Sequence, residues 1–462
     1  YDANTNALAA DITLGNLVSG EALNHSGTAT IGSANAGSYT ISNLTGITIA
    51  DGSGGAASNY TLTGGTHNFT VNRRVVGVSG TRLYDATTNA VASDLSTHAN
   101  LVGSETLNLS GTGTIASKDV GSSKTVTVGT LALADGSNGG LAANYTLSGG
   151  THQLTVNQRP LNATLARQYD GTTTAAGSTL SSLDALQGGE TLTLSGSGTA
   201  AGANVANGIT MSSNGNLALA DGTGLASNYS LNSTVINIAK RVLNSSGSKL
   251  YDANTNALAG AITLSNLVSG EAVNHSGTAT TSSANAGSYT ITNLAGITIA
   301  DGSGGTASNY TLTGGTHNFT VNQRLLNATL ARQYDGTTAS AGSTLSSFDA
   351  LQAGETLTLS GSGTAASTNV ANGISVSSLG TLALVNGTGL ASNYSLNSAS
   401  LNITQRILNS SGSKTYDANT NALAADITLG NLVSGEALNH SGTATIGSAN
   451  AGSYTISNLT GI

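Results

Sequence analysis

The sequence predicts an all-β protein, a tandem array of small β-sandwich or β-grasp-like domains of about 83 residues. A Tyr-Asp dipeptide recurs along the 462-residue chain at intervals of 83, 85, 82, 83 and 82 residues. Short runs of alternating apolar and polar residues, separated by Gly, Asn, Ser and Asp, recur at intervals of roughly ten residues. Long amphipathic helical patterns are absent, and only residues 184–187 and their equivalents could hold a helical turn.

Three residue types keep a fixed phase in every period. The Tyr-Asp dipeptides are Tyr1-Asp2, Tyr84-Asp85, Tyr169-Asp170, Tyr251-Asp252, Tyr334-Asp335 and Tyr416-Asp417. An arginine stands ten residues before each later Tyr, at Arg74, Arg159, Arg241, Arg324 and Arg406. The only Glu of each period follows the Tyr by 20 or 21 residues, at Glu21, Glu105, Glu190, Glu271, Glu355 and Glu436. One small unit copied several times explains this phasing better than one large core.

The arginines divide the chain into six repeats. Repeat 1 covers residues 1–73 and lacks its first strand, and repeat 6 covers residues 406–462 and is partial. The complete repeats cover 74–158, 159–240, 241–323 and 324–405. Likeness between repeats gives the order A B C A C A, so near-identical units are never neighbours. We hypothesise that this order reduces strand exchange during folding.

The opening strand of a repeat sets where its Tyr-Asp dipeptide lies. Apolar residues alternate with polar ones from Leu161 to Tyr169, as in a half-buried strand. A ten-residue strand spans about 33 Å, which carries the chain from one pole of a small domain to the other. The closing strand must end at the same far pole to reach the next repeat. We therefore expect the first and last strands to be parallel and possibly adjacent.

This geometry suggests a clamp at each junction between repeats. We hypothesise that the Asp of one repeat lies near the Arg that opens the next, in the pairs Asp85 with Arg159, Asp170 with Arg241, Asp252 with Arg324 and Asp335 with Arg406. In the alternative interpretation, the Tyr belongs to the core and the Asp caps a turn. Because the junctions hold one Pro, Pro160, and no Gly/Ser linker, we expect the domains to be joined end to end as a stiff rod. A continuous β-solenoid is the alternative architecture.

Composition excludes several classes of partner. Only 8% of residues are charged, and the net charge of −8 is spread along the chain, so no basic face is available for nucleic acid. No apolar run approaches the roughly 20 residues of a membrane span. The chain has no Cys, which suits export through an oxidising compartment in an unfolded state. It starts and stops inside repeats, and we expect any targeting segment to lie outside it.

The motifs that could carry chemistry favour structural roles. His25-Ser26 could hold a base and a nucleophile, yet other repeats place Leu109 and Leu194 in the His slot. The Asp51-Gly loop lacks the ligand pattern of a calcium or phosphate site and favours a turn. The Asn-Tyr-Thr/Ser triplets, such as that at Asn59, are possible glycosylation sequons, although an Asn opening a strand is the simpler explanation. We therefore predict no catalytic, metal-binding or cofactor-binding residues, no cofactor and no enzymatic activity.

A family resemblance agrees with this interpretation. The Tyr-Asp-Gly-Thr-Thr segments at Tyr169 and Tyr334, followed by Gly-Glu-Thr-Leu-Thr-Leu-Ser-Gly and Asn-Tyr-Ser-Leu, resemble the YDG-type repeats of large Gram-negative surface adhesins, which are filamentous-haemagglutinin-like proteins exported by two-partner secretion. The A and B units depart from that pattern with Tyr-Asp-Ala.

The resemblance implies an extracellular or cell-surface stalk or fibre that extends a binding region, or a component of a biofilm matrix. The partners that we expect are other copies of the protein in a filament or matrix, glycans, or a host surface. The alternative function is a multivalent module in which each repeat binds glycan or host protein weakly.

Overall fold

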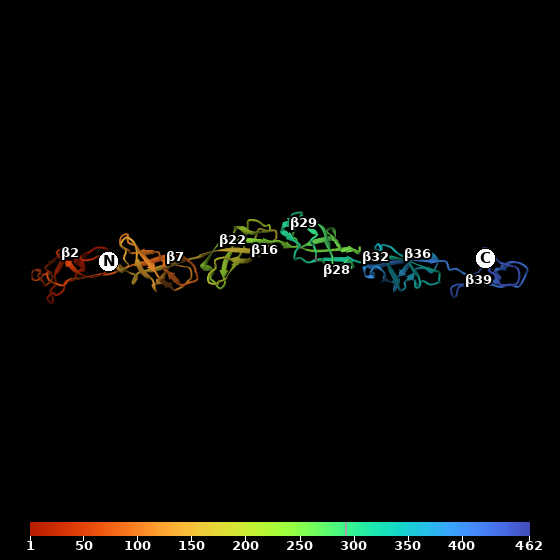
Figure 1. Ribbon diagram of the computed structural model, residues 1–462, viewed down its shortest axis with the longest axis horizontal. Coiled ribbons are helices and arrows are strands. Elements are labelled where there is room, and N and C mark those ends of the chain that lie inside the picture. The colour runs from red at the N-terminus through yellow and green to blue at the C-terminus, as the bar shows by residue number, and fades with distance from the viewer. Residues whose placement is uncertain (292) are drawn as a thin grey trace. The chain divides into compact units, whose positions relative to one another are not determined.

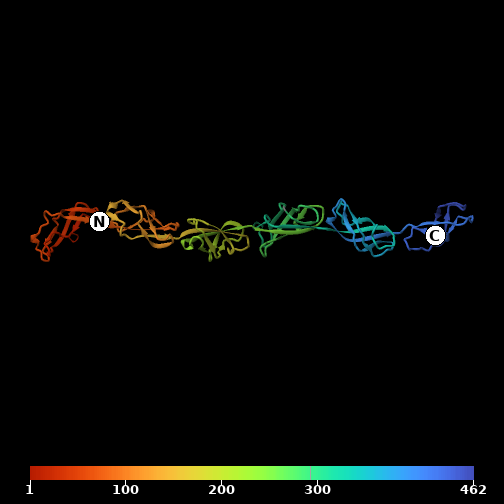
Figure 2. The same ribbon diagram turned by 90° about the horizontal axis from the view of Figure 1, so that it is seen from below.

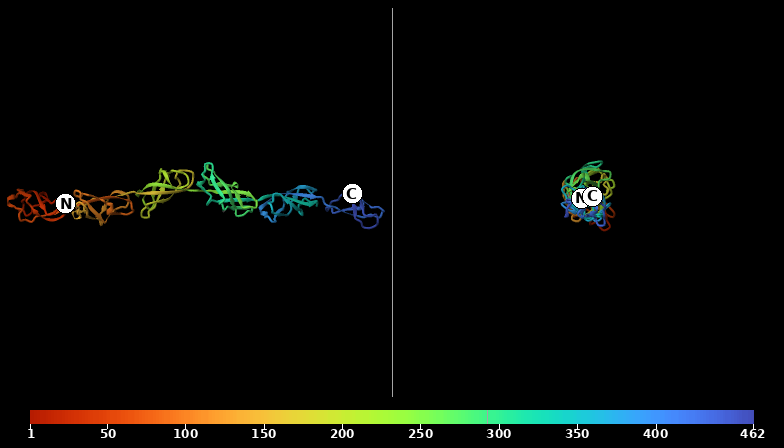
Figure 3. Two further views of the ribbon diagram at one scale, coloured as in Figure 1. Left: turned by 45° about the horizontal axis from the view of Figure 1, so that its top comes forward. Right: turned by 90° about the vertical axis from the view of Figure 1, so that its right-hand side faces the viewer.

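The computed structural model describes residues 1–291 and 293–462, in two compact units, Tyr1–Ala239 and Lys240–Ile462. Each unit is described by itself. The regular elements of the described residues are β-strands and three-residue 3-10 helices, labelled η in the text. The predicted all-β class is therefore confirmed. Each repeat is its own group of strands in Figure 2 and Figure 3, and the strands of every sheet belong to one repeat. This arrangement is a tandem array and not a continuous solenoid.

Repeat 3 shows the complete topology. Its elements are β16 (Arg159–Gln168), β17 (Thr179–Leu183), β18 (Leu192–Ser195), β19 (Thr199–Ala200), β20 (Ala206–Ser213), β21 (Ala218–Asp221), η5 (Ala226–Asn228) and β22 (Tyr229–Ala239). The main sheet has the order β17-β16-β22-β20-β19, and β18 pairs with β21 in a second, two-stranded sheet. The first strand β16 pairs in parallel with the last strand β22, and the two run side by side in Figure 1. The expected parallel pairing of first and last strands is thus confirmed.

The alternation of side chains explains why β16 and β22 occupy the middle of the sheet. Leu161, Ala163 and Leu165 are at most 3% exposed on one face of β16, and Ile236 and Ile238 are at most 1% exposed on β22. The intervening residues of both strands are polar or less deeply buried. Period-two burial of this kind places one face of the strand pair on the core.

Two local hydrogen-bonding features fix the segments that lead into β22 and out of β17. Asp221 accepts a hydrogen bond from the Ala226 N–H at 2.7 Å and so caps the single turn η5. Residues 184–187, the segment that could have held a helical turn, do not form one, because the segment is bent and Ala185 has a φ of +57°. The Asp184 carboxylate accepts bonds from the backbone N–H and the side-chain amide of Asn162, which hold the segment against β16.

Repeats 1 and 2 have related sheets. The elements of repeat 1 are β1 (Asn6–Leu8), η1 (Ala9–Asp11), β2 (Asn24–Ile31), β3 (Gly37–Asn43), β4 (Ile47–Ala50), η2 (Ala57–Asn59) and β5 (Asn68–Val71). Those of repeat 2 are β6 (Arg74–Val75), β7 (Gly77–Leu83), β8 (Asn89–Val91), η3 (Ala92–Asp94), β9 (Thr97–Ala99), β10 (Leu107–Ser110), β11 (Thr112–Ile115), β12 (Gly121–Thr127), β13 (Ala132–Asp135), η4 (Ala142–Asn144), β14 (Tyr145–Thr146) and β15 (His152–Asn157). In repeat 2 the parallel terminal pair is β7 with β15.

The second unit repeats this plan. The elements of repeat 4 are β23 (Arg241–Val242), β24 (Asn244–Leu250), β25 (Asn256–Leu258), η6 (Ala259–Ala261), β26 (Ile262–Ser265), β27 (Val273–Thr280), β28 (Gly287–Thr290), β29 (Ile297–Asp301), η7 (Ala307–Asn309), β30 (Tyr310–Thr311) and β31 (His317–Asn322). Those of repeat 5 are β32 (Arg324–Gln333), β33 (Thr344–Phe348), β34 (Leu357–Ser360), β35 (Thr364–Ala365), β36 (Ala371–Ser378), β37 (Ala383–Asn386), η8 (Ala391–Asn393) and β38 (Tyr394–Thr404). Those of repeat 6 are β39 (Asn409–Gly412), β40 (Asn421–Leu423), η9 (Ala424–Asp426), β41 (Ile427–Gly430), β42 (Thr443–Ile446) and β43 (Ile456–Asn458). The parallel terminal pairs are β24 with β31 and β32 with β38.

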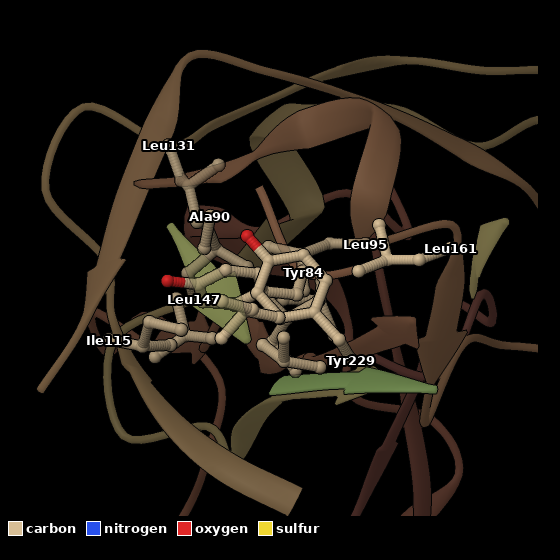
Figure 4. Packing of buried hydrophobic residues seen from close by; sticks show 13 residues of the cluster. Tyr84, Ala90, Leu95, Ile115, Leu131, Leu147, Leu161 and Tyr229 are labelled. Carbon is tan, nitrogen blue, oxygen red and sulfur yellow. The ribbon is translucent and has the colours of Figure 1, made fainter. Parts of the chain in front are cut away.

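The hydrophobic core of repeat 2 continues into repeat 3. Tyr84, Leu95 and Leu154 of repeat 2 share one buried cluster with Leu161 and Tyr229 of repeat 3, and Figure 4 shows Tyr84 among its members. A second cluster joins repeat 4 to repeat 5 in the same way. The thin core of a repeat of about 80 residues is thus enlarged by residues of the neighbouring repeat.

Candidate functional site: the junction between repeats

A glutamate and two tyrosines form the centre of the junction between repeats 2 and 3. Tyr84 of repeat 2 donates its hydroxyl to Glu190 Oε1 at 2.6 Å, and Tyr229 of repeat 3 donates to Glu190 Oε2 at 2.8 Å. The rings of the two tyrosines pack edge to face, with centroids 5.3 Å apart and planes at 76°. One carboxylate therefore joins a phenol of its own repeat to a phenol of the preceding repeat.

Burial controls the protonation of this group. Tyr84 is fully buried and Tyr229 is 2% exposed. The pKa of Tyr229 is raised to about 12, mainly by burial and also by the bond to Glu190, although the hydrogen bond from the Gln187 N–H lowers it in part. Burial would raise the pKa of Glu190, but hydrogen bonds from Lys118, Tyr84 and Tyr229 lower it overall. The group is thus an ionised carboxylate with neutral phenol donors, a stable arrangement for a buried charge.

The same geometry recurs at two other junctions. Between repeats 1 and 2, Tyr1 and Tyr145 donate to the two oxygens of Glu105 at 2.6 and 2.5 Å. Between repeats 4 and 5, Tyr251 and Tyr394 both donate to Glu355. Both tyrosine pairs pack edge to face with centroids 5.3 Å apart. The boundary between repeats 3 and 4 separates the two compact units, so it is not included in this comparison.

A buried asparagine forms the second contact across each of these junctions. Asn228 accepts a hydrogen bond from the Val120 N–H at 2.9 Å and donates to the Asp119 carboxylate at 2.9 Å, both in the preceding repeat. Asn144 contacts Ala36 and Asn35 through the same two bonds. Asn393 contacts Ala286 and Asn285 in the second unit. The side chain therefore satisfies its acceptor and one of its donors at the junction.

The burial of these asparagines shows which of the possible glycosylation sequons could carry a glycan. Asn144, Asn228, Asn309 and Asn393 are at most 1% exposed, whereas Asn59 in repeat 1 is exposed. A glycan on any of the four buried amides would not fit in the folded chain. Asparagine at these positions is part of the packing, because its side chain bonds to the neighbouring repeat at the three junctions above.

The side chain of the junction arginine binds a backbone carbonyl of the Tyr-Asp dipeptide in the preceding repeat. Arg159 Nη1 donates to the Tyr84 carbonyl at 3.3 Å, and its Nε donates to the Ala185 carbonyl at 2.9 Å. Arg74, Arg324 and Arg406 donate to the carbonyls of Tyr1, Tyr251 and Tyr334. Each of these arginines therefore bonds to the residue that directly precedes the Asp of the dipeptide. Within its unit, Arg241 donates to Asn266.

The Asp of the dipeptide forms its ion pair with a residue of its own repeat, and the predicted ion pair with the junction arginine is wrong. Asp85 pairs with Arg82 of its own repeat at 3.0 Å, and Asp335 pairs with Arg332. Asp170 pairs with Arg167, Asp252 with Lys249 and Asp417 with Lys414. Arg82 also donates to the Thr87 and Asn89 carbonyls, so this cation organises the loop after the dipeptide. The Asp carboxylate faces that cation, three residues before it in sequence, and accepts the Thr87 N–H as a turn cap.

The remaining polar motifs have local partners. His25 Nε2 lies 2.8 Å from the Ile12 carbonyl, whereas Ser26 Oγ lies 2.9 Å from Thr48 Oγ1, so each is bonded away from the other. The carboxylates of Asp51, Asp135, Asp221 and Asp301 each accept a backbone N–H at 2.7 Å, and Asn386 Oδ1 does the same. The prediction of a turn is confirmed. Asn can replace Asp at this position without loss of the capping hydrogen bond, because the bond requires only one side-chain oxygen.

Sequence reasoning found the dipeptide and the arginine but missed the other two parts of the junction. The phased Glu was used only to mark the period, and the Asn-Tyr dipeptide was interpreted as the start of a strand. A signal was present in both cases. In a chain with only 8% charged residues, a single Glu per period at a fixed distance from a Tyr indicates a specific partner.

Comparison with known protein families gives one match. The profile of the family described as YDG domain matches four segments, residues 70–154, 151–236, 239–317 and 324–401, which together make up well over half of the chain. No curated protein matches the chain. Within residues 1–291 and 293–462, no helix has both the length and the hydrophobicity to cross a membrane.

Proposed function

Because this chain belongs to the YDG domain family, we propose that it is a non-enzymatic structural array, the stalk or fibre of a secreted bacterial surface adhesin or biofilm-matrix protein. In this role it extends a binding region away from the cell. The observation that carries the proposal is the repeated junction, in which one repeat binds the Tyr of the preceding repeat through its Glu and the Asp119 region of that repeat through its Asn. Such contacts limit rotation between neighbouring repeats, which is what a spacer requires.

The distribution of tyrosine supports a spacer over a glycan-binding module. Aromatic rings on a surface are the usual platforms for sugars, and only 4% of the residues are aromatic. The tyrosines at the three junctions described above are mostly buried and bonded to glutamate. In the parts of the chain that the structure describes, the most exposed tyrosine is Tyr416, in repeat 6.

An exchange of repeats in the producing bacterium tests the proposal. Residues 159–405, which hold repeats 3 to 5, are replaced in the full-length protein by unrelated β-domains of the same total length. A stalk predicts that surface exposure and adhesion are retained, and that deletion without replacement reduces adhesion. Loss of adhesion after replacement, together with binding of the purified 462-residue chain to a glycan array, would establish the binding-module alternative instead. An intracellular location of the protein in fractionated cells would refute the proposal altogether.

A further inference from the structure

The first and last strands of each complete repeat form a central parallel pair. In repeat 3, ten residue pairs join β16 to β22, from Arg159 opposite Tyr229 to Gln168 opposite Ala239, with a bulge of one residue after the third pair. In repeat 5, ten pairs join β32 to β38, with a bulge at the same place. These strands are flanked on both sides, by β17 and β20 in repeat 3 and by β33 and β36 in repeat 5. Their ladder is therefore covered from both edges of the sheet.

The chain enters and leaves a repeat at opposite ends of this ladder. Only Gln158 separates the end of β15 from the start of β16, and only Gln323 separates β31 from β32. A pull on the chain would thus act at the start of the first strand and at the end of the last strand. Because the two strands are parallel, this pull slides one along the other and loads all the hydrogen bonds of the ladder together.

We propose that the repeats are load-bearing elements that resist tension along the chain, and that the C-type repeats 3 and 5 are the strongest of them. Bonds loaded together must break together, whereas strands pulled apart from one end lose their bonds one at a time. The inference rests on the proposed function only for its biological use, since a stalk under shear must transmit force. The resistance itself is a property of the strand order.

The register predicts a ranking between repeat types. The corresponding ladder of repeat 4 is divided into two pairs between β23 and β30 and six pairs between β24 and β31. Repeat 2 has the same division, with two pairs between β6 and β14 and six between β7 and β15. The C ladders are interrupted by a single unpaired residue, whereas the two paired segments of repeat 4 are separated by several residues, between Thr311 and His317, so the divided ladder can fail in two steps. The A and B repeats are therefore expected to unfold at lower force than the C repeats.

The test is single-molecule force spectroscopy on the full chain. Since the chain has no Cys, introduced cysteine pairs are unique points of attachment. In the variant Q158C/K240C the pull shears β16 along β22. In the variant Q158C/S227C both attachments precede the paired strand starts, so the pull peels the same ladder open from one end. All of these positions are exposed, and both variants lose the same bond from Gln158 to the Ser227 carbonyl.

The expected result is a rupture force several-fold higher for shearing than for peeling, with equal thermal stability of the two variants without force. Equal rupture forces in the two directions would overturn the proposal. For the ranking, Q323C/Q405C across repeat 5 should rupture at higher force than K240C/Q323C across repeat 4, and the reverse order or equality would overturn it. These measurements use purified protein, so they can fail while the surface-stalk proposal stands, and an intracellular location would leave them unchanged.

Discussion

Tyr84 and Tyr334 occupy the same place in their repeats but differ in how the following repeat covers them. Tyr84 is fully buried and shares Glu190 with Tyr229. Tyr334 is half-buried and also donates to a glutamate, Glu436, which is exposed. Repeat 6 ends at Ile462, before the position of the Asn-Tyr dipeptide. The closing half of the following repeat therefore completes the burial, and the glutamate alone does not.

Tyr416 extends the comparison. It is 63% exposed in repeat 6, the last repeat within the 462 residues. Among these three tyrosines, the exposed fraction is larger where fewer residues of the following repeat are present within the 462. The tyrosine of the dipeptide, as Tyr84 shows, is buried jointly by its own repeat and by the following one, so the stability of one repeat depends on the next, as in other repeat arrays.

The largest effect is expected from removing the buried ring. Tyr84→Ala should destabilise repeats 2 and 3 by about 3–5 kcal/mol, because a fully buried aromatic side chain is lost and a cavity remains. Tyr416→Ala is the matched control and should change stability by less than about 0.5 kcal/mol, since its ring is mostly exposed. Urea unfolding of both variants measures the difference. Equal effects of the two substitutions would contradict the comparison.

High pH should weaken the junctions next. The pKa of Tyr229 is raised from 10.0 to about 12 by burial and by the bond to Glu190. Above pH 10 the unfolded chain loses the phenol proton more readily than the folded chain, so this contribution to stability is complete below that pH and declines as the pH rises to about 12. Urea unfolding at a series of pH values should show a steeper decline for the natural chain than for Tyr229→Phe. Parallel curves would show that Tyr229 keeps an ordinary pKa.

The asparagine contact should have an intermediate effect. Asn228→Ala leaves the partly buried Val120 N–H and Asp119 carboxylate without this partner, at an expected cost of about 1–3 kcal/mol. Asn59→Ala replaces the exposed equivalent in repeat 1 and should be neutral within about 0.5 kcal/mol. Thermal unfolding of the two variants compares a buried and an exposed copy of the same residue. A neutral Asn228→Ala would remove this residue from the junction.

The smallest effect is expected at Lys118, which is found only in the B repeat. Its ammonium lies 2.7 Å from Glu190 Oε1, and its side chain is 42% exposed. Lys118→Met should lower stability slightly at low salt and not at high salt, because the lysine is partly exposed and dissolved ions screen its charge. Unfolding midpoints at two salt concentrations measure the difference. A loss of the same size at both concentrations would show that the contact is packing of the lysine stem and not charge.

The sequence predicts the parts of the fold that depend on local patterns. The alternation from Leu161 to Tyr169 gives the central strand, and the need to return to the far pole gives its parallel pairing with β22. The Asp51-type caps also follow from local turn chemistry. Contacts across about 105 residues, such as Tyr84 with Glu190, have no local pattern and depend on how two repeats meet. The Asp85 partner is the opposite case, because Arg82 stands only three residues before it, and the expectation of a partner across the junction overlooked this local pair.

Hydrogen exchange of Glu190→Ala tests most directly whether neighbouring repeats share one core. Glu190 belongs to repeat 3, but its loss leaves the Tyr84 hydroxyl of repeat 2 without this acceptor. A shared core predicts loss of amide protection in β7 and β15 of repeat 2 as well as in β18 and β22 of repeat 3. Loss confined to repeat 3, with β7 and β15 protected as before, would show that the repeats are stable independently and would contradict the account.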